Sequence, residues 1–206
     1  MNADSFYSLS RSLWHFFGPT PAGIIGDLWI LFCLYWLVSA LNGKKTKRSE
    51  SFGQRMAYVL PLVAAFYLLY HRGLRYPWLL ARFVPGTLLV AWLGVLTMAS
   101  GLAIAAWARI HLGSNWSGVV TLKEGHELIR TGPYRTIRHP IYSGILLAFL
   151  GNAIALGEVR GLIGLAVIWL SFYVKARREE SFLTQEFGAR FNEHTQHTGM
   201  FLPKFS

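Results

Sequence analysis

Residues 132–144 read GPYRTIRHPIYSG and lead directly into an uncharged, apolar segment that extends from Ile141 to Gly157. Pro140 restricts His139 to extended backbone conformations and is tolerated in the first turn of a helix, so a helix is predicted to begin here. Polar and ionisable groups are costly at a membrane boundary and usually mark a functional site. We therefore expect an active site where this helix leaves water and enters lipid.

The composition of the whole chain is that of an integral membrane protein. Of the 206 residues, 53% are hydrophobic and 15% are charged, whereas a soluble domain carries about 25% charged residues. The apolar runs predict five membrane-spanning helices, which are Ala22–Leu41, Met56–Tyr70, Phe83–Ala108, Ile141–Gly157 and Gly161–Val174. Because a straight span needs about 20 residues, the second and fifth of these predicted spans are short.

These segments predict an all-α helical bundle. We expect a single membrane domain over residues 1–206, with three transmembrane helices in residues 1–108 and a cofactor-binding catalytic half in residues 109–206. After the fifth span, Phe182, Leu183, Phe187 and Phe191 share one helix face, with charged residues between them. This pattern predicts that the helix continues after the fifth span as an amphipathic tail helix along the membrane surface, which Gly188 would interrupt.

The basic residues indicate how the chain is oriented. A net charge of +10 is found in many nucleic-acid-binding proteins, but here Lys and Arg cluster beside apolar runs, as topology signals and anionic-lipid contacts do. The clusters follow the first span, precede the fourth and follow the fifth. Five spans place all three on one side, which predicts a cytoplasmic C-terminus and an N-terminus outside. Arg72, Arg75 and Arg82 are the exception to this charge pattern, because five spans place them on the outer side.

Metal and disulfide chemistry are not expected. Cys33 is the single cysteine, so no disulfide can form within the chain and no thiolate cluster can bind a metal. His111, His194 and His197 do not follow a metal-ligand pattern. An N-terminus that is nearly uncharged before the apolar run at Ala22 also argues against a cleaved secretory signal peptide.

Two polar clusters flank the fourth and fifth spans. Only Glu158, Val159 and Arg160 separate these spans, which predicts a tight antiparallel hairpin whose inner ends meet. Such a site suits a small zwitterionic ligand, because cations bind a carboxylate, Glu179 or Glu180 binds an ammonium, and tyrosine faces bind a purine or sulfonium. The clusters are His126, Tyr134, Arg138, His139 and Tyr142, and then Lys175, Arg177, Arg178, Glu179 and Glu180.

These residues resemble the isoprenylcysteine carboxyl methyltransferases, in the broader group that includes phospholipid N-methyltransferases. The resemblance covers roughly the C-terminal half, about Asn115 to Pro203. It implies a membrane-embedded enzyme that uses S-adenosylmethionine. It is carried by His126–Ile129, Gly132–Tyr134, Arg138–Gly144, Glu179-Glu180, Leu183, Phe187-Gly188 and Leu202-Pro203.

The resemblance also implies roles for individual residues. The cofactor contacts it implies are His126, Glu127, Leu128, Ile129, Tyr134, His139, Pro140, Ile141, Tyr142 and Glu179, with Glu180 as the neighbouring alternative. The catalytic set is Lys175, Arg177 and Glu180. Lys175 stands where the family has a substrate-positioning arginine, and a lysine offers a point charge instead of a planar fork. Arg177 would face elsewhere on the helix.

The implied reaction is an in-line displacement at a sulfonium methyl group. A carboxylate acceptor needs no general base, whereas a neutral acceptor would use Glu180 or His139. We expect a lipophilic acceptor that enters from the bilayer and a cofactor that enters from the cytosol, with no nucleic-acid partner. The alternatives are a phospholipid amine or a small thiol as acceptor, a nicotinamide-dependent membrane reductase, and a non-enzymatic scaffold.

Overall fold

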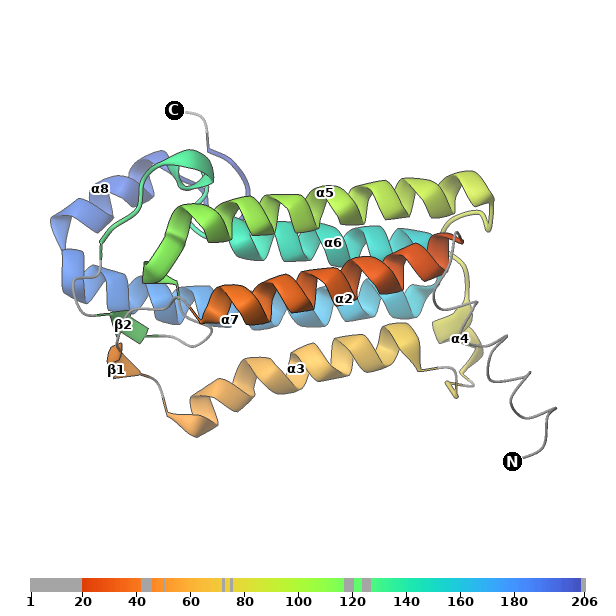
Figure 1. Ribbon diagram of the computed structural model, residues 1–206. Coiled ribbons are helices and arrows are strands. Elements are labelled where there is room, and N and C mark those ends of the chain that lie inside the picture. The colour runs from red at the N-terminus through yellow and green to blue at the C-terminus, as the bar shows by residue number, and fades with distance from the viewer. Residues whose placement is uncertain are drawn as a thin grey trace.

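The computed structural model describes residues 20–41, 46–49, 51–71, 73–74, 76–116, 121–123 and 127–204. Over these residues the fold is a bundle of long helices with a small two-stranded sheet at one end (Figure 1). The helices are α2 (Pro21–Ala40), α3 (Phe52–Tyr70), α4 (Pro77–Leu80), α5 (Leu88–Leu112), α6 (Pro140–Leu156), α7 (Val159–Phe187) and α8 (Ala189–His197). Short 3-10 turns, η1 (Gly113–Asn115) and η2 (Gly132–Arg135), precede α6, and the strands are β1 (Thr46–Ser49) and β2 (Thr121–Lys123).

The predicted all-α membrane bundle is confirmed, and each of the five apolar segments is a helix. Four of them, α2, α3, α5 and α7, are long and apolar enough to cross a membrane. Helix α6 is apolar but has 17 residues. At 1.5 Å per residue it extends about 25 Å, a little less than the roughly 30 Å hydrocarbon core of a bilayer.

The predicted start of the third span was wrong, for a local reason. Helix α5 begins at Leu88 and not at Phe83, because the Thr87 side chain caps it by accepting a hydrogen bond from the Val90 amide at 3.3 Å. The predicted continuation of the helix after the fifth span is confirmed, since α7 extends 13 residues beyond Val174. The predicted interruption at Gly188 is confirmed as well, because α7 stops there and the φ of +51° favours glycine. The amphipathic tail therefore consists of the end of α7 and the separate helix α8.

The turn between α6 and α7 is tighter than predicted. Gly157 adopts a left-handed conformation with φ of +73°, and α7 begins two residues later at Val159. Such a turn forces the two helices to run antiparallel. The prediction of a hairpin is therefore confirmed, and the start of α6 lies beside the residues of α7 that follow its apolar part.

The three basic regions lie at the same end of the bundle, as the count of five spans predicts. Antiparallel pairing of β1 with β2 joins the connection after α2 to the connection before η2. Helix α8 is at this end too, whereas α4 and the α6–α7 turn lie at the other (Figure 1). The backbones of Arg82 and Glu158 form an isolated β-bridge at that other end, so Arg82 remains an exception to the charge pattern. Arg72 and Arg75 lie outside the described residues.

The most intimate helix contact is between α5 and α6, which approach each other backbone to backbone. A Cβ atom on Gly101 would lie 2.5 Å from the carbonyl oxygen of Gly144, and one on Gly144 would lie 2.5 Å from that of Gly101. Gly94 and Gly151 make a second contact of this kind, one heptad away on each helix. Lipid tails are as apolar as leucine, so small residues that permit close packing are what hold membrane helices together.

We predict that Gly101→Ala destabilises the protein by about 1–3 kcal/mol or more, because a methyl group here would overlap the backbone of α6. Thermal unfolding of the detergent-purified protein measures the effect. The matched control is Gly53→Ala in the first turn of α3, where a Cβ would meet no atom within 4 Å, so its midpoint should stay or rise. Equal midpoints for the two variants would contradict this role of the α5–α6 contact.

Candidate functional site

A cavity of about 680 Å³ opens inside the bundle and has two chemically different parts. Its polar part is lined by Asn115, Tyr134, Arg138, His139, Lys175 and Glu179. Its apolar part is lined mainly by aromatic and aliphatic side chains of α2, α3 and α6, among them Trp29, Phe32, Trp36, Leu62, Phe66 and Phe149. The N-terminal helices are therefore more than an anchor, because α2 and α3 form walls of this cavity and α5 adds Leu112 to its lining.

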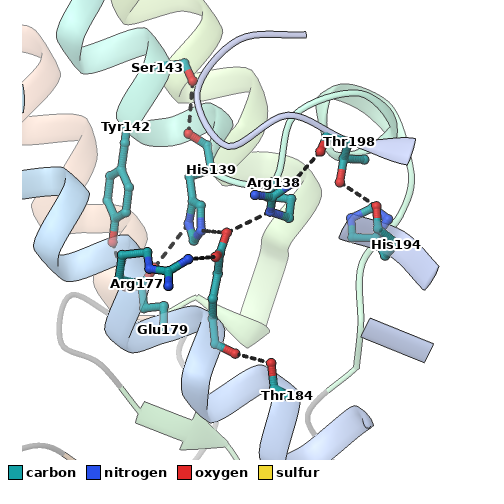
Figure 2. A network of polar contacts seen from close by, with 10 residues as sticks. Arg138, His139, Tyr142, Ser143, Arg177, Glu179, Thr184, His194 and Thr198 are labelled. Atoms are coloured by element: carbon teal, nitrogen blue, oxygen red, sulfur yellow. Dashed lines mark hydrogen bonds and ion pairs between the residues drawn. The ribbon is translucent and has the colours of Figure 1, made fainter. Parts of the chain in front are cut away.

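The predicted meeting of the two polar clusters is the centre of the polar part. His139 precedes α6, and its imidazole lies between two carboxylates of α7 (Figure 2). Nδ1 is 3.4 Å from Glu179 Oε2, and Nε2 is 3.3 Å from Glu180 Oε1. The Tyr142 hydroxyl donates to Glu179 Oε1 at 2.6 Å, and its ring stacks on the imidazole at a centroid distance of 5.5 Å.

The charge state of His139 follows from these contacts. Burial alone would lower the pKa of His139, but the hydrogen bonds and charges of Glu179 and Glu180 outweigh it, so the pKa is raised. The imidazolium form donates from both ring nitrogens. A histidine with both nitrogens engaged has no lone pair with which to take a proton, so the geometry disfavours His139 as a general base.

Glu180 lies behind His139 and does not line the cavity. It accepts a hydrogen bond from Arg138 Nε at 2.7 Å, and Arg138 also donates to the Thr198 carbonyl oxygen. Arg177 is on the far side of the same carboxylate, 3.9 Å from it, with a side chain that is 64% exposed. Of the three residues in the predicted catalytic set, the structure therefore brings only Lys175 to the cavity.

The chain near its C-terminal end holds the start of α6 in place. The amides of Arg138 and His139 donate to the carbonyl oxygens of Gly199 and Met200 at 2.8 and 3.1 Å. The Ser143 hydroxyl donates to the Phe201 carbonyl oxygen at 2.7 Å. These bonds fix the backbone that carries His139. Two of the three join backbone groups, which carry no sequence signal of this pairing.

Lys175 is buried, and its ammonium group lies against two aromatic faces. Nζ is 4.5 Å from the ring centroid of Tyr58 and 5.4 Å from that of Tyr142. Such cation–π contacts stabilise a cation away from water. Lys175 and Glu179 line the same cavity, as their spacing of four residues predicts. Tyr58, from α3, was missed by sequence reasoning because nothing distinguishes it from other aromatic residues of an apolar span.

Tyr134 and Asn115 complete the polar part. The Tyr134 hydroxyl is buried and has no hydrogen-bond partner among the described residues. Burial, followed by the Glu179 carboxylate, raises the pKa of Tyr134, while Arg109 opposes this shift, so the hydroxyl stays protonated. A buried unpaired hydroxyl costs free energy, which a polar ligand would recover. The Asn115 side chain accepts a hydrogen bond from the Glu127 amide at 3.4 Å.

The other predicted cofactor contacts differ in their placement. Ile141 lines the cavity, whereas Pro140 is buried in the first turn of α6 and sets where that helix begins. His126 falls outside the described residues. Glu127, Leu128 and Ile129 do not line the cavity, and Ile129 packs against the hydrophobic core. Within the described part of the chain, no group of three or more His, Cys, Asp or Glu side chains is placed to hold a metal.

Arg109 and Trp116 were also missed by sequence reasoning. The guanidinium of Arg109 lies 4.4 Å from the Trp116 ring centroid, and its Nη1 donates to the Gly113 carbonyl oxygen at 2.7 Å. Trp116 lines the cavity and packs edge-on against Trp36 at 5.3 Å. Arg109 also donates to the Ser39 carbonyl oxygen, so it links α5 to the end of α2 near the polar part.

Comparisons with known proteins agree with this geometry. Residues 89–190 match the family model for phospholipid methyltransferases. A probable protein-S-isoprenylcysteine O-methyltransferase of Oryza sativa subsp. indica is 29% identical over 173 residues, which cover 81% of this chain and 87% of that protein. The protein-S-isoprenylcysteine O-methyltransferase of Mus musculus is 24% identical over 204 residues, which cover 95% and 68%.

A solved structure of a eukaryotic intramembrane Ras methyltransferase, isoprenylcysteine carboxyl methyltransferase, has the same fold. Its TM-score is 0.55 at 22% identity, and the match covers 92% of this chain and 70% of that one. The fold, the sequence relatives and the polar cluster at the start of α6 thus lead to one conclusion. The chain is a membrane methyltransferase that is similar in sequence and in fold to the isoprenylcysteine carboxyl methyltransferases.

Proposed function

We propose that this protein transfers a methyl group from S-adenosylmethionine to the carboxylate of a prenylated cysteine. The observation that carries the proposal is that Lys175 and Glu179 line the same cavity as a long apolar wall. A prenylcysteine has a carboxylate at one end and an apolar chain at the other, so its two ends match the two parts of the cavity.

The polar part fits the methyl donor. S-adenosylmethionine supplies a methyl group made electrophilic by a positively charged sulfur. Glu179 offers a carboxylate to the ammonium group, and the Tyr142 ring and the unpaired Tyr134 hydroxyl offer an aromatic face and a polar contact. His139 holds Glu179 from behind, so this carboxylate is oriented before any ligand arrives. Such preorganisation reduces the cost of aligning the reacting groups.

Two observations indicate the kind of acceptor: the ammonium group of Lys175 at the cavity, and the hydrogen bonds and ion pairs that already occupy His139 and Glu180. The buried ammonium of Lys175 can attract and orient a carboxylate, although without the planar fork of an arginine. An ionised carboxylate needs no general base, which agrees with the engagement of His139 and Glu180 in hydrogen bonds and ion pairs. A phospholipid amine or a protonated thiol would need such a base.

The reductase alternative is less well supported by the arrangement of the cations. A nicotinamide dinucleotide would need cations for its phosphates. Arg138 is engaged by Glu180 and by the Thr198 carbonyl oxygen, and Arg177 is outside the cavity. The charged side chains that line the polar part of the cavity are better suited to a zwitterion than to a pyrophosphate.

We also propose that the polar end of the bundle faces the cytosol, with the N-terminus outside. The three basic regions support this orientation, because cytoplasmic loops carry an excess of Lys and Arg. The donor would then enter from the cytosol, and the prenyl chain would enter from the bilayer through the apolar part of the cavity.

Donor binding is the first test. We expect S-adenosylmethionine and S-adenosylhomocysteine to bind the detergent-purified protein at micromolar concentrations in calorimetry. The double variant His139→Ala/Glu179→Ala should lose this binding, because it removes the carboxylate and the group that orients it. Arg177→Ala, which changes an exposed residue outside the cavity, is the control and should bind normally. No binding to well-folded wild-type protein would contradict the choice of donor.

Lys175 should act on the acceptor and not on the donor. We expect Lys175→Met to reduce kcat/KM for a prenylcysteine acceptor by about 10- to 100-fold, the loss of one charge-assisted hydrogen bond worth about 1.5–3 kcal/mol. Donor affinity should change little, and Lys175→Arg should restore much of the activity. Equal losses in Lys175→Met and Arg177→Met would count against the acceptor assignment.

The orientation is testable with single cysteines in a Cys33→Ser background. Gln185→Cys lies at the polar end of the bundle, and Pro85→Cys lies in the connection before α5 at the other end. In sealed cells, a membrane-impermeant thiol reagent should label the cysteine at 85 and spare the one at 185. The reverse pattern would overturn the proposed orientation.

A further inference from the structure

Two side chains of opposite charge are neighbours on α7. Lys175 and Glu179 are four residues apart on this helix, and both line the cavity. Opposite charges at this spacing attract each other, and the attraction grows where water is excluded. A direct ion pair between the two would satisfy each side chain with the other. Neither would then be available to a ligand, so their placement relative to each other affects both ligands of the proposed reaction.

The Glu179 carboxylate is held by two other groups. Its Oε2 is 3.4 Å from His139 Nδ1, and its Oε1 accepts a hydrogen bond from the Tyr142 hydroxyl at 2.6 Å. The Tyr142 ring is itself fixed, because it stacks on Phe172 at a centroid distance of 4.6 Å and on His139 at 5.5 Å. The orientation of Glu179 is therefore set by residues at the start of α6.

The ammonium group of Lys175 is placed by aromatic rings. Nζ lies 4.5 Å from the ring centroid of Tyr58 and 5.4 Å from that of Tyr142. An ammonium group over a ring face is stabilised by the negative face of the ring, and more so away from water. A neutral ring stabilises the ammonium group without neutralising its charge, whereas a carboxylate would neutralise it. The nearer of the two rings, that of Tyr58, belongs to α3.

The position of Tyr58 is fixed by a contact between α3 and α7. Pro61 lies inside α3 and removes one backbone hydrogen bond from this part of the helix. The Tyr58 carbonyl oxygen accepts a hydrogen bond from the Ser171 hydroxyl of α7 at 3.4 Å. Ser171 precedes Lys175 by about one helical turn, and Tyr58 is buried. The contact therefore holds the Tyr58 ring at the level of the ammonium group.

We propose that Tyr58 keeps Lys175 apart from Glu179, so that each charged group remains available to its own ligand. The ammonium group of Lys175 then binds the carboxylate of the acceptor, and the Glu179 carboxylate binds the ammonium group of the donor. Tyr58 is thus a positioning residue that acts on both ligands through Lys175. The inference rests on the proposed function, because it takes a zwitterionic donor and an anionic acceptor as the ligands.

The test is the affinity of the detergent-purified protein for S-adenosylhomocysteine, which has the same ammonium group as the donor. In Tyr58→Leu the ring is lost, so Lys175 should pair with Glu179, and calorimetry should show an affinity about tenfold lower than that of the wild type. In Tyr58→Leu/Lys175→Met no ammonium group remains to pair with Glu179. The affinity of this double variant should therefore return to that of Lys175→Met alone, whereas a general loss of packing would lower it as much as in Tyr58→Leu.

Two single variants are the matched controls. Tyr58→Phe keeps the ring face toward the ammonium group, so its affinity should stay within about twofold of the wild type. Tyr67 is another tyrosine of α3, but it is 51% exposed and does not line the cavity, so Tyr67→Leu should leave the affinity unchanged. The second readout is kcat/KM for N-acetyl-S-farnesylcysteine, which should fall about tenfold or more in Tyr58→Leu and change little in the controls.

The outcomes separate this inference from the proposed function. Binding by the wild type, with equal affinity losses in Tyr58→Leu and Tyr58→Leu/Lys175→Met, would overturn the inference and leave the function standing. Unchanged affinity in Tyr58→Leu would do the same. If Tyr58→Leu does not fold, Tyr58→Met, which has a longer side chain and no ring, decides by the same comparison. The expected affinities without any methylation would support the inference and overturn only the prenylcysteine acceptor. No binding by well-folded wild-type protein would overturn the donor and the inference together.

Discussion

The close approach of α5 and α6 is the constraint on which the site depends. Gly101 and Gly144 have no side chains, so the two backbones touch where any larger residue would separate them. Within a bilayer there is little hydrophobic gain from joining two apolar helices, and close packing has to supply the stabilisation. Helix α6 is held in this way, and it carries His139 and Tyr142 at its start. A two-residue turn then positions α7 with Glu179 and Glu180.

A chain of buried charges then makes the polar end rigid. Arg138, Glu180, His139 and Glu179 form a continuous series of contacts between the start of α6 and α7 (Figure 2). Removing one member of such a series leaves an uncompensated buried charge, which typically costs more than the pair contributes. These contacts hold the Glu179 carboxylate in one orientation through His139. Lys175 and Tyr134 are outside the series and face the cavity.

The two N-terminal helices α2 and α3 give the cavity its lipid-like character. They contribute the aromatic wall at Trp29 and Phe66, and α3 contributes the Tyr58 ring against Lys175. An enzyme whose acceptor resides in the bilayer needs a continuous path from the apolar core to the reacting carboxylate. In this bundle one cavity joins the polar part, with Lys175 and Glu179, to the apolar part lined by Trp29 and Phe66, and this cavity would be the path for the proposed acceptor.

Much of the architecture is encoded locally. The five apolar segments, the hairpin, the start of α6 at Pro140 and the meeting of the two polar clusters all follow from composition, helix-starting residues and the spacing of charged groups. These features depend on neighbours in the sequence, so they are readable from it. The start of α5 at Leu88 was predicted wrongly because a threonine cap is a weak signal.

Other features were set by tertiary packing. Nothing in the order of residues distinguishes Glu179, which faces the cavity, from Glu180, which faces Arg138. The same holds for the choice of Tyr58 and Trp29 from among many residues in apolar spans. Helices that are apolar on all sides have no amphipathic pattern to report which face is buried. That choice is made when side chains from distant helices pack together, and so it depends on the assembled bundle.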